Sequence, residues 1–262
     1  MPLDPADVEA CLRVLAAVGD AEPGDERART VRAAVDRAYK RQKKQQRTAR
    51  RRASSEHDRR LLSAPAADDP DLVRQRRCYV CKSPYRAVPL DYPQMCAGCA
   101  AGNGARRTAR CDLTGRRALV TGGRIKIGLP FLLTGRLRPL LRASPFPDRY
   151  VVNVSAMEGS FSRERKTPNH PHTNMAKAGL NMLTRTIAEQ YAAEGIHVTS
   201  VDTGWVTDER PQPARDGLRA RGFRVPLDVV DGAARVYDPI VRGVHGDRVH
   251  GVFLKDYRVV HW

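Results

Sequence analysis

Four cysteines in the first half of the chain have the type and spacing of metal ligands. They form two CxxC pairs separated by fourteen residues: Cys78, Cys81, Cys96 and Cys99. One CxxC turn directs two thiolates at a common point, and two such turns complete the tetrahedral sulfur shell that zinc prefers. The alternative, a redox-active dithiol, needs only one pair. Because the protein supplies all four ligands, we expect a structural zinc that folds a small zinc ribbon.

A glycine-rich turn in the middle of the chain is a second candidate site. The apolar run Ala118–Val120 predicts a short buried strand, and Thr121, Gly122 and Gly123 interrupt it. Pro130 then stands where a helix takes its first residue. A strand, a glycine turn and a helix start together offer unpaired backbone N–H groups and a positive dipole end to a phosphate. The alternative is an ordinary tight turn between a strand and a helix.

Three later stretches follow this turn in a characteristic order. They are Tyr150–Ala156 (YVVNVSA), Asn174–Leu183 (NMAKAGLNML) and Ile196–Asp208 (IHVTSVDTGWVTD). Together with the glycine turn, they resemble the short-chain dehydrogenase/reductase family. Its pattern is a TGxxxGxG turn, a strand ending in NxSS, a YxxxK helix and a strand ending in a PGxxxT loop. The resemblance covers the chain from about Leu113 to the C-terminus.

This resemblance implies an NAD(P)-dependent oxidoreductase that exchanges a hydride between nicotinamide and a small-molecule carbonyl or alcohol. The cofactor would be NAD or NADP. Lys177 matches the lysine of YxxxK, which positions the nicotinamide ribose in the family. Ser155 directly precedes Ala156, which holds the usual serine position. The cofactor-binding positions implied by the family pattern are Thr121, Gly122, Gly123, Arg124, Ile127, Gly128, Lys177, Gly204, Val206 and Thr207.

The catalytic tyrosine of the family is replaced here by Thr173. An alkanol is far less acidic than a phenol, whose pKa is about 10, so Thr173 cannot serve as an acid/base near neutral pH. We therefore expect an impaired enzyme. The nearby His170 and His172 offer an imidazole that could transfer protons instead, or they are two surface histidines.

The chain also lacks the segment that the family places between Gly128 and Pro130, about a hundred residues. That segment would supply three strands and the residue that reads the adenosine ribose. A right-handed strand–helix–strand unit could form across the join, with Ala118–Val120 beside the strand at Tyr150–Val154. The expected fold class is thus α/β, a Rossmann-like, shortened and mostly parallel sheet with flanking helices.

Composition and periodicity outline the rest. Asp4 can cap a helix over residues 3–18. Residues 26–60 are expected to be helical in their first half, and the charged second half is either a nucleic-acid or partner arm or a solvated helix that fades into linker. Further predicted elements are a helix over 174–194, a strand at Ile196–Val201, a helix at Leu227–Val236 and a strand at Val249–Leu254. The expected domains are a basic helical arm (1–62), a linker (63–75), the zinc ribbon (76–110) and the truncated Rossmann domain (111–262).

The chain has 262 residues and a net charge of +17, and this excess of positive charge favours the binding of polyanions. We expect weak polyanion binding by the basic arm, or merely arginine on solvated faces. No membrane-spanning run and no leader peptide are seen, so we expect a cytoplasmic protein. A homo-oligomer remains open. Two rival functions also remain open: a non-catalytic nucleotide-binding relic, and a zinc-ribbon protein that binds nucleic acid or a partner.

Overall fold

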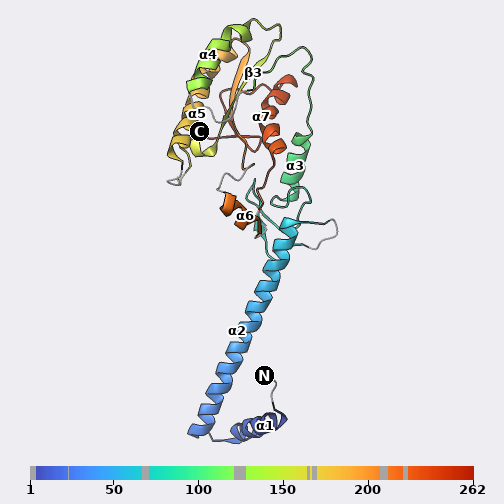
Figure 1. Ribbon diagram of the computed structural model, residues 1–262, viewed down its shortest axis with the longest axis vertical. Coiled ribbons are helices and arrows are strands. Elements are labelled where there is room, and N and C mark those ends of the chain that lie inside the picture. Colours follow the sequence, from blue (N-terminus) through green and yellow to red (C-terminus); the bar gives the residue numbers. More distant parts are fainter. Residues whose placement is uncertain are drawn as a thin grey trace. The chain divides into compact units, whose positions relative to one another are not determined.

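The computed structural model describes residues 4–22, 24–66, 71–120, 128–163, 166, 170–206, 212–220 and 224–262. The chain divides into two compact units, Met1–Arg59 and Arg60–Trp262. Figure 1 shows its helices and strands, which are, in chain order, α1 (Pro5–Asp20), α2 (Glu26–Ser63), β1 (Arg76–Arg77), β2 (Pro84–Tyr85), α3 (Ala97–Arg107), α4 (Gly128–Arg142), β3 (Arg149–Ser155), the 3₁₀ turn η1 (Met157–Gly159), α5 (Pro171–Ala192), β4 (Ile196–Asp202), α6 (Gln212–Ala220), α7 (Val229–Val244), β5 (Phe253–Lys255) and β6 (Arg258–Val260).

The N-terminal unit consists of α1 and most of α2. Asp4 caps α1, as the sequence predicts, by accepting a hydrogen bond from the backbone N–H of Ala6 at 3.0 Å. Arg32 of α2 donates to the carbonyl of Val18 at 2.9 Å and so links the two helices. The apolar face of α1 has no buried residue, and Leu12 is 60% exposed. This unit therefore has little hydrophobic core of its own.

The charged second half of residues 26–60 is helical, so the alternative in which it fades into linker does not hold. Helix α2 continues without interruption to Ser63. Alanine, glutamine, lysine and arginine are strong helix formers, and their flexible side chains let like charges separate into solvent. Arg59 and Glu56 also pair near the end of the helix. Local propensity thus outweighs the charge repulsion that the sequence suggested.

The second unit begins with a small module, residues 76–107, that contains the four cysteines. Strands β1 and β2 form a short antiparallel hairpin in which Arg76 pairs with Tyr85. Cys78 and Cys81 lie in the connection between these strands. Cys96 occupies the N-cap position of α3, and Cys99 lies in the first turn of this helix. We call residues 76–107 the four-cysteine module.

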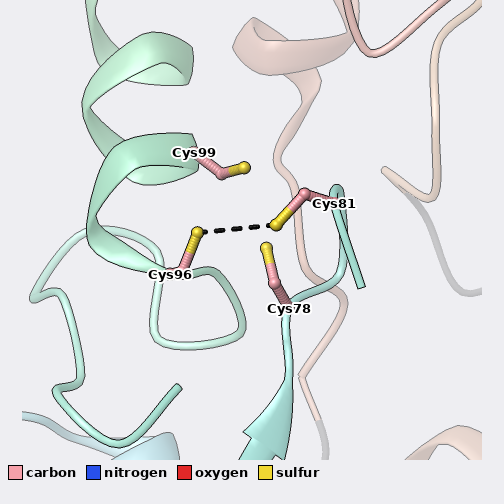
Figure 2. A group of neighbouring side chains, drawn as sticks. All are labelled: Cys78, Cys81, Cys96 and Cys99. Carbon is pink, nitrogen blue, oxygen red and sulfur yellow. Dashed lines mark hydrogen bonds between the residues drawn. The ribbon is translucent and has the colours of Figure 1, made fainter. Parts of the chain in front are cut away.

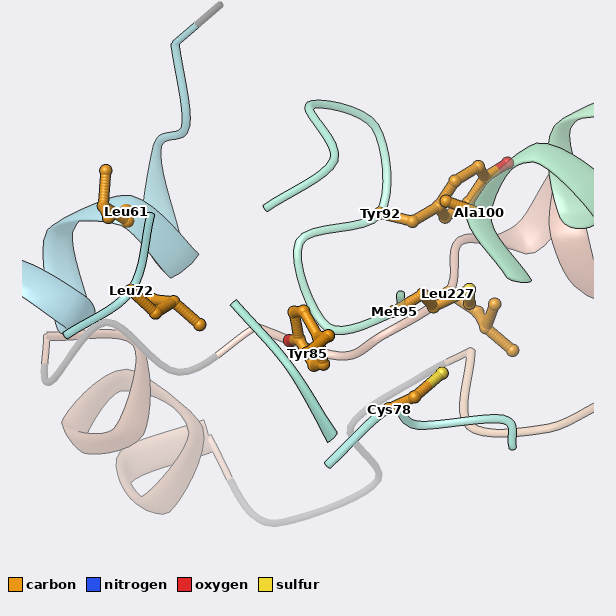
Figure 3. Close-up of a cluster of buried hydrophobic side chains, with 8 residues drawn as sticks. All are labelled: Leu61, Leu72, Cys78, Tyr85, Tyr92, Met95, Ala100 and Leu227. Atoms are coloured by element: carbon orange, nitrogen blue, oxygen red, sulfur yellow. The ribbon is translucent and has the colours of Figure 1, made fainter. Parts of the chain in front are cut away.

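The core of this module is small and partly aromatic. Figure 3 shows its buried members, which come from the module, from the end of α2, from the chain before β1 and from the chain before α7: Leu61, Leu72, Cys78, Tyr85, Tyr92, Met95, Ala100 and Leu227. The phenol of Tyr85 donates to the carbonyl of Pro93 at 2.7 Å, so this buried hydroxyl is satisfied. Residues from outside the module therefore complete its hydrophobic core.

The main sheet has four strands in the order β3-β4-β5-β6. Strands β3 and β4 are parallel, with Arg149 opposite Ile196 and Ser155 opposite Asp202. Strand β5 is parallel to β4, and β6 returns antiparallel to β5. All seven residues of β4 are buried, as expected of a central parallel strand. Helices α4 and α5 lie on one side of the sheet and α7 on the other, with α3 packed on α7 (Figure 1).

The expected fold class is confirmed in this unit: a shortened, mostly parallel sheet with flanking helices follows the four-cysteine module. The predicted helix at 174–194 and the strand at Ile196–Val201 correspond to α5 and β4. The predicted helix Leu227–Val236 is longer, because α7 extends to Val244. The last predicted strand is shorter and is followed by β6, which the sequence analysis missed.

The predicted strand Ala118–Val120 is wrong. These residues have no regular structure, and Leu119 and Val120 are 65% and 91% exposed. Among the described residues, no strand pairs with the outer edge of β3, so the predicted strand–helix–strand unit is not formed. A three-residue apolar run becomes a buried strand only when a neighbouring strand completes its ladder. The chain just before it is anchored, since Arg116 pairs with Asp148 at 2.9 Å.

Helix α7 is joined to the four-cysteine module by a buried polar network. The carboxylate of Asp231 accepts hydrogen bonds from Tyr92 at 2.9 Å and from Asn103 at 3.0 Å. Arg235, fully buried, donates to Asn103 at 2.9 Å. Arg107 pairs with Asp231 at 2.9 Å and with Asp228, whose pKa its guanidinium lowers to about 2. Module and sheet therefore share one interior.

No helix in the described parts of the chain is both long and apolar enough to cross a membrane.

Candidate functional site

The four cysteines come together at one point of the module. Their sulfur atoms all lie within 4.8 Å of one another, and Cys81 Sγ is 3.7 Å from Cys96 Sγ. In Figure 2, Cys96 and Cys99 reach this point from the start of α3, and Cys78 and Cys81 reach it from the hairpin. None of the four cysteines forms a disulfide. Sulfurs about 3.8 Å apart are what a tetrahedral zinc with bonds of about 2.3 Å requires, so this donor set fits the ion.

Backbone hydrogen bonds shape this cysteine cluster. The N–H of Cys78 donates to the carbonyl of Ser83 at 2.9 Å, which closes the turn that carries the first pair. Hydrogen bonds from Ser83 lower the pKa of the Cys81 thiol to about 6, whereas burial raises the pKa of Cys99 to about 12. Burial without a compensating cation opposes the thiolate form, and a bound divalent cation would stabilise it.

A second group of functional residues lies at the carboxyl ends of β3 and β4, where parallel sheets place their ligands. Asp202, the last residue of β4, is only 6% exposed. Its two carboxylate oxygens accept hydrogen bonds from the backbone N–H groups of Gly204 at 2.6 Å and Met157 at 2.7 Å. Lys255 of β5 lies 3.3 Å from the same carboxylate. Asp202 thus joins the loops that follow β3 and β4.

Lys177 and Ser155, two of the predicted catalytic residues, lie together at this edge. The ammonium of Lys177 donates to the carbonyl of Val154 at 2.6 Å, and the hydroxyl of Ser155 donates to the carbonyl of Lys177 at 3.2 Å. Ser155 is buried. The turn η1 approaches α5 so closely here that a Cβ at Gly159 would lie 2.5 Å from the backbone of Lys177. The hydrogen bonds of Ser155 and Lys177, two of the predicted catalytic residues, thus hold β3 and α5 together.

Thr173, the third predicted catalytic residue, is exposed near the start of α5, one turn before Lys177. His170 and His172 are also exposed, with ring centroids 6.4 Å apart. His170 adopts a left-handed backbone conformation, with φ of 57°, just before the helix. The structure therefore places three weakly acidic or titratable groups on the solvent side of the helix start.

The predicted cofactor residues divide into two sets. Thr121, Gly122, Gly123, Arg124, Ile127 and Thr207 lie outside the described residues. Of the others, Gly128 is exposed at the first position of α4. Gly204 has φ of 75° in the loop after β4, and Val206 packs against the core of the four-cysteine module.

Sequence reasoning missed Asp202 and Asp231, which link separate segments of the chain. Asp202 could have been suspected, because a carboxylate that ends a buried strand needs hydrogen-bond donors there. Asp231 gave a local signal as well, since it follows Asp228 at the capping-box spacing that the structure confirms. Neither signal identifies the distant partners Tyr92 and Met157.

Three comparisons place the chain among known proteins. Residues 130–221 match the family model described as enoyl-(acyl carrier protein) reductase, which is a short-chain dehydrogenase/reductase model. "Uncharacterized protein R665" of Acanthamoeba polyphaga mimivirus is 42% identical over 103 residues, which are 37% of this chain and 21% of that protein. This chain therefore spans about a fifth of the length of that curated relative.

Solved structures show a weaker likeness. The carbonyl reductase Sniffer of D. melanogaster matches with a TM-score of 0.38 and 19% identity, over 58% of this chain and 61% of that one. The NADPH-bound carbonyl reductase from chicken fatty liver matches with a TM-score of 0.39 and 18% identity, over 63% and 73% of the two chains.

Replacing the carboxylate of Asp202 should destabilise the carboxyl edge of the sheet. In Asp202→Asn, one carboxylate acceptor becomes an amide donor, so one of the two short backbone hydrogen bonds is lost and Lys255 loses its counter-charge. We expect the free energy of unfolding to fall by about 2–3 kcal/mol, as for a buried charge-assisted hydrogen bond.

Urea unfolding of the full chain measures this effect. Ser155→Ala is the matched control, since it removes a single neutral hydrogen bond at the same edge and should cost about 1 kcal/mol. Equal losses in the two variants would contradict a bracing role for Asp202.

Proposed function

We propose that this chain is an NAD(P)-linked oxidoreductase of the short-chain dehydrogenase/reductase family with low or absent turnover, since residues 130–221 match a model of that family. The supporting observation is the contact of Lys177 with Val154. The ammonium that would position a nicotinamide ribose instead donates to a strand carbonyl at 2.6 Å. The nearby hydroxyl of Ser155 is likewise bonded to the helix backbone. Both predicted catalytic groups thus have structural partners.

Proton transfer is the weakest part of this proposed activity. When bound, nicotinamide would supply or accept the hydride, and a small carbonyl or alcohol would be the other reactant. The chain must then provide a proton at the substrate oxygen, and Thr173 cannot do so near neutral pH. His170 and His172 are exposed at the start of the same helix and stay the alternative donors.

The nucleotide site is proposed for the same edge of the sheet. The nicotinamide half suits Lys177, Gly204 and Val206, with Thr207 following in sequence. The phosphates are proposed for residues 121–128, before α4. In the described residues the sheet begins at β3, so no further strand is available there for the adenosine half. We therefore expect weak binding of NAD or NADP.

A first experiment measures binding and turnover directly. Calorimetry with NADH and NADPH should show dissociation constants in the high micromolar to millimolar range, because only half of the family's binding surface is available. Reduction of small carbonyls should be slow or undetectable. Robust turnover would contradict the impairment, and no binding of either cofactor at millimolar concentration would favour the alternative of a zinc-ribbon protein that binds nucleic acid or a partner.

A paired variant tests the missing acid/base. The double variant Ala156→Ser/Thr173→Tyr restores both family side chains, and we expect turnover to rise by about 10²-fold, as for a positioned general acid. The control Ala156→Ser/Thr173→Phe has the same bulk without the phenol and should stay at the wild-type level. If the two double variants turn over equally, the absent tyrosine is not what limits the reaction.

We propose that the four cysteines bind one structural zinc. Metal analysis of the purified chain should find about one zinc per molecule. Cys96→Ser should lose the metal and unfold the module, because zinc supplies folding free energy to small domains. Cys111→Ser is the control, since Cys111 contacts Tyr237 at 3.1 Å outside the cluster and its loss should leave the zinc in place. A metal-free protein with reduced thiols would end this proposal.

A second function, weak polyanion binding, is favoured by α2. Residues 40–60 contain ten lysines and arginines and two acidic residues, and the structure presents this stretch as one continuous helix. No aromatic residue lies between these charges to stack on bases, so binding should be electrostatic and without sequence preference.

Heparin chromatography tests this second function. Neutralising Lys43, Lys44, Arg51 and Arg52 to glutamine keeps helix propensity and should lower the salt needed for elution. The control removes four exposed arginines from the C-terminal unit for the same change in net charge: Arg136, Arg185, Arg248 and Arg258. Equal shifts in both variants would mean that retention follows net charge alone.

A further inference from the structure

Both ends of the segment that joins β4 to α7 rest on the four-cysteine module. After β4, the backbone N–H of Trp205 donates a hydrogen bond to the phenol oxygen of Tyr79 at 3.0 Å. Before α7, the side-chain amide of Gln94 donates to the carbonyl of Arg224 at 2.7 Å, and Leu227 is buried in the module core. Helix α6 lies between these two attachments in sequence.

Tyr79 is placed by the cysteine cluster itself. It directly follows Cys78 and lies two residues before Cys81. Its backbone N–H donates to the carbonyl of Gln94 at 2.8 Å, which connects the first cysteine pair to the chain leading into the second. Closing the four-sulfur shell around a metal would fix this turn, and with it the direction of the Tyr79 side chain.

The loop after β4 is confined on two sides. Asp202 holds the N–H of Gly204 at 2.6 Å from the sheet side. On the module side, a Cβ at Gly204 would lie 2.6 Å from Leu227 Cδ1 and 3.3 Å from the Tyr79 oxygen. Gly204 also has φ of 75°, a conformation that other residues rarely adopt. The conformation of this loop therefore depends on the module surface as well as on β4.

We propose that the four-cysteine module positions the loop after β4, with Tyr79 as the positioning residue. Metal occupancy then sets the order of residues 203–206, at the edge where the nicotinamide half is proposed to bind. The consequence for nucleotide affinity rests on the proposed function. The consequence for the loop does not, because it follows from the hydrogen bond between Tyr79 and Trp205 alone.

The test replaces Tyr79→Phe in the full, zinc-loaded chain. This change keeps the ring and removes only the oxygen that accepts from Trp205. We expect amide hydrogen exchange at Trp205 to accelerate by about tenfold, as for the loss of one net hydrogen bond, with zinc content unchanged. The dissociation constant for NADH should rise several-fold. Chelation of the wild-type metal under reducing conditions should accelerate Trp205 exchange while Val198 in β4 stays protected.

Tyr85→Phe is the matched control. It removes a phenol oxygen from the same core, but that oxygen bonds Pro93 inside the module, so Trp205 exchange and NADH affinity should stay at wild-type values. Unchanged Trp205 exchange in Tyr79→Phe would overturn the proposal. So would chelation that exposes Val198 as strongly as Trp205, since the metal would then support global stability alone. Absence of NADH binding by the wild type would contradict the proposed function. The hydrogen-exchange result at Trp205 would still test the present inference by itself.

Discussion

The buried carboxylate of Asp231 is the interaction on which the C-terminal unit depends. A charge taken out of water costs several kcal/mol unless it is paired and fully hydrogen-bonded. Here one oxygen accepts from Tyr92, Asn103 and Arg107, and the other accepts from the N–H of Asp228 at the start of α7. The same carboxylate thus completes the cap of a helix on the sheet and satisfies three side chains of the four-cysteine module. The network therefore links the packing of α7 to that of the module.

This arrangement explains how so small a module can be ordered. Its hydrophobic core contains few residues and includes Leu61 and Leu227, which lie outside the module in sequence. Cores of this size rarely supply enough stabilisation by themselves, and small domains usually add a metal or a disulfide. The four thiols fit the first of these solutions, and the polar network with α7 adds a second support. Arg235 strengthens that network because its fully buried guanidinium is bonded to both Asn103 and Asp256.

The sequence predicted best what is encoded over short distances. The cysteine cluster follows from spacing alone, and β3, α5 and β4 follow from short stretches rich in β-branched residues and from helical periodicity. The failed strand at Ala118–Val120 shows the limit, because a strand also needs a neighbour and the described sheet offers none at that place. In the same way, Asp202 and Asp231 take their roles from partners 45 and 139 residues away in the chain. No local pattern specifies such pairs.

At the ends of β3 and β4, two of the predicted catalytic residues bind the backbone. Ser155 of β3 donates to the carbonyl of Lys177 in α5, and Lys177 donates to the carbonyl of Val154 in β3. A strand that lacks a neighbour on one side gains stability from every link to the helix that covers it, and a charge-assisted bond is among the stronger links available. An ammonium group has three donors, so Lys177 can keep its bond to the Val154 carbonyl and still offer N–H groups to a ligand, and that bond fixes the position from which they are offered.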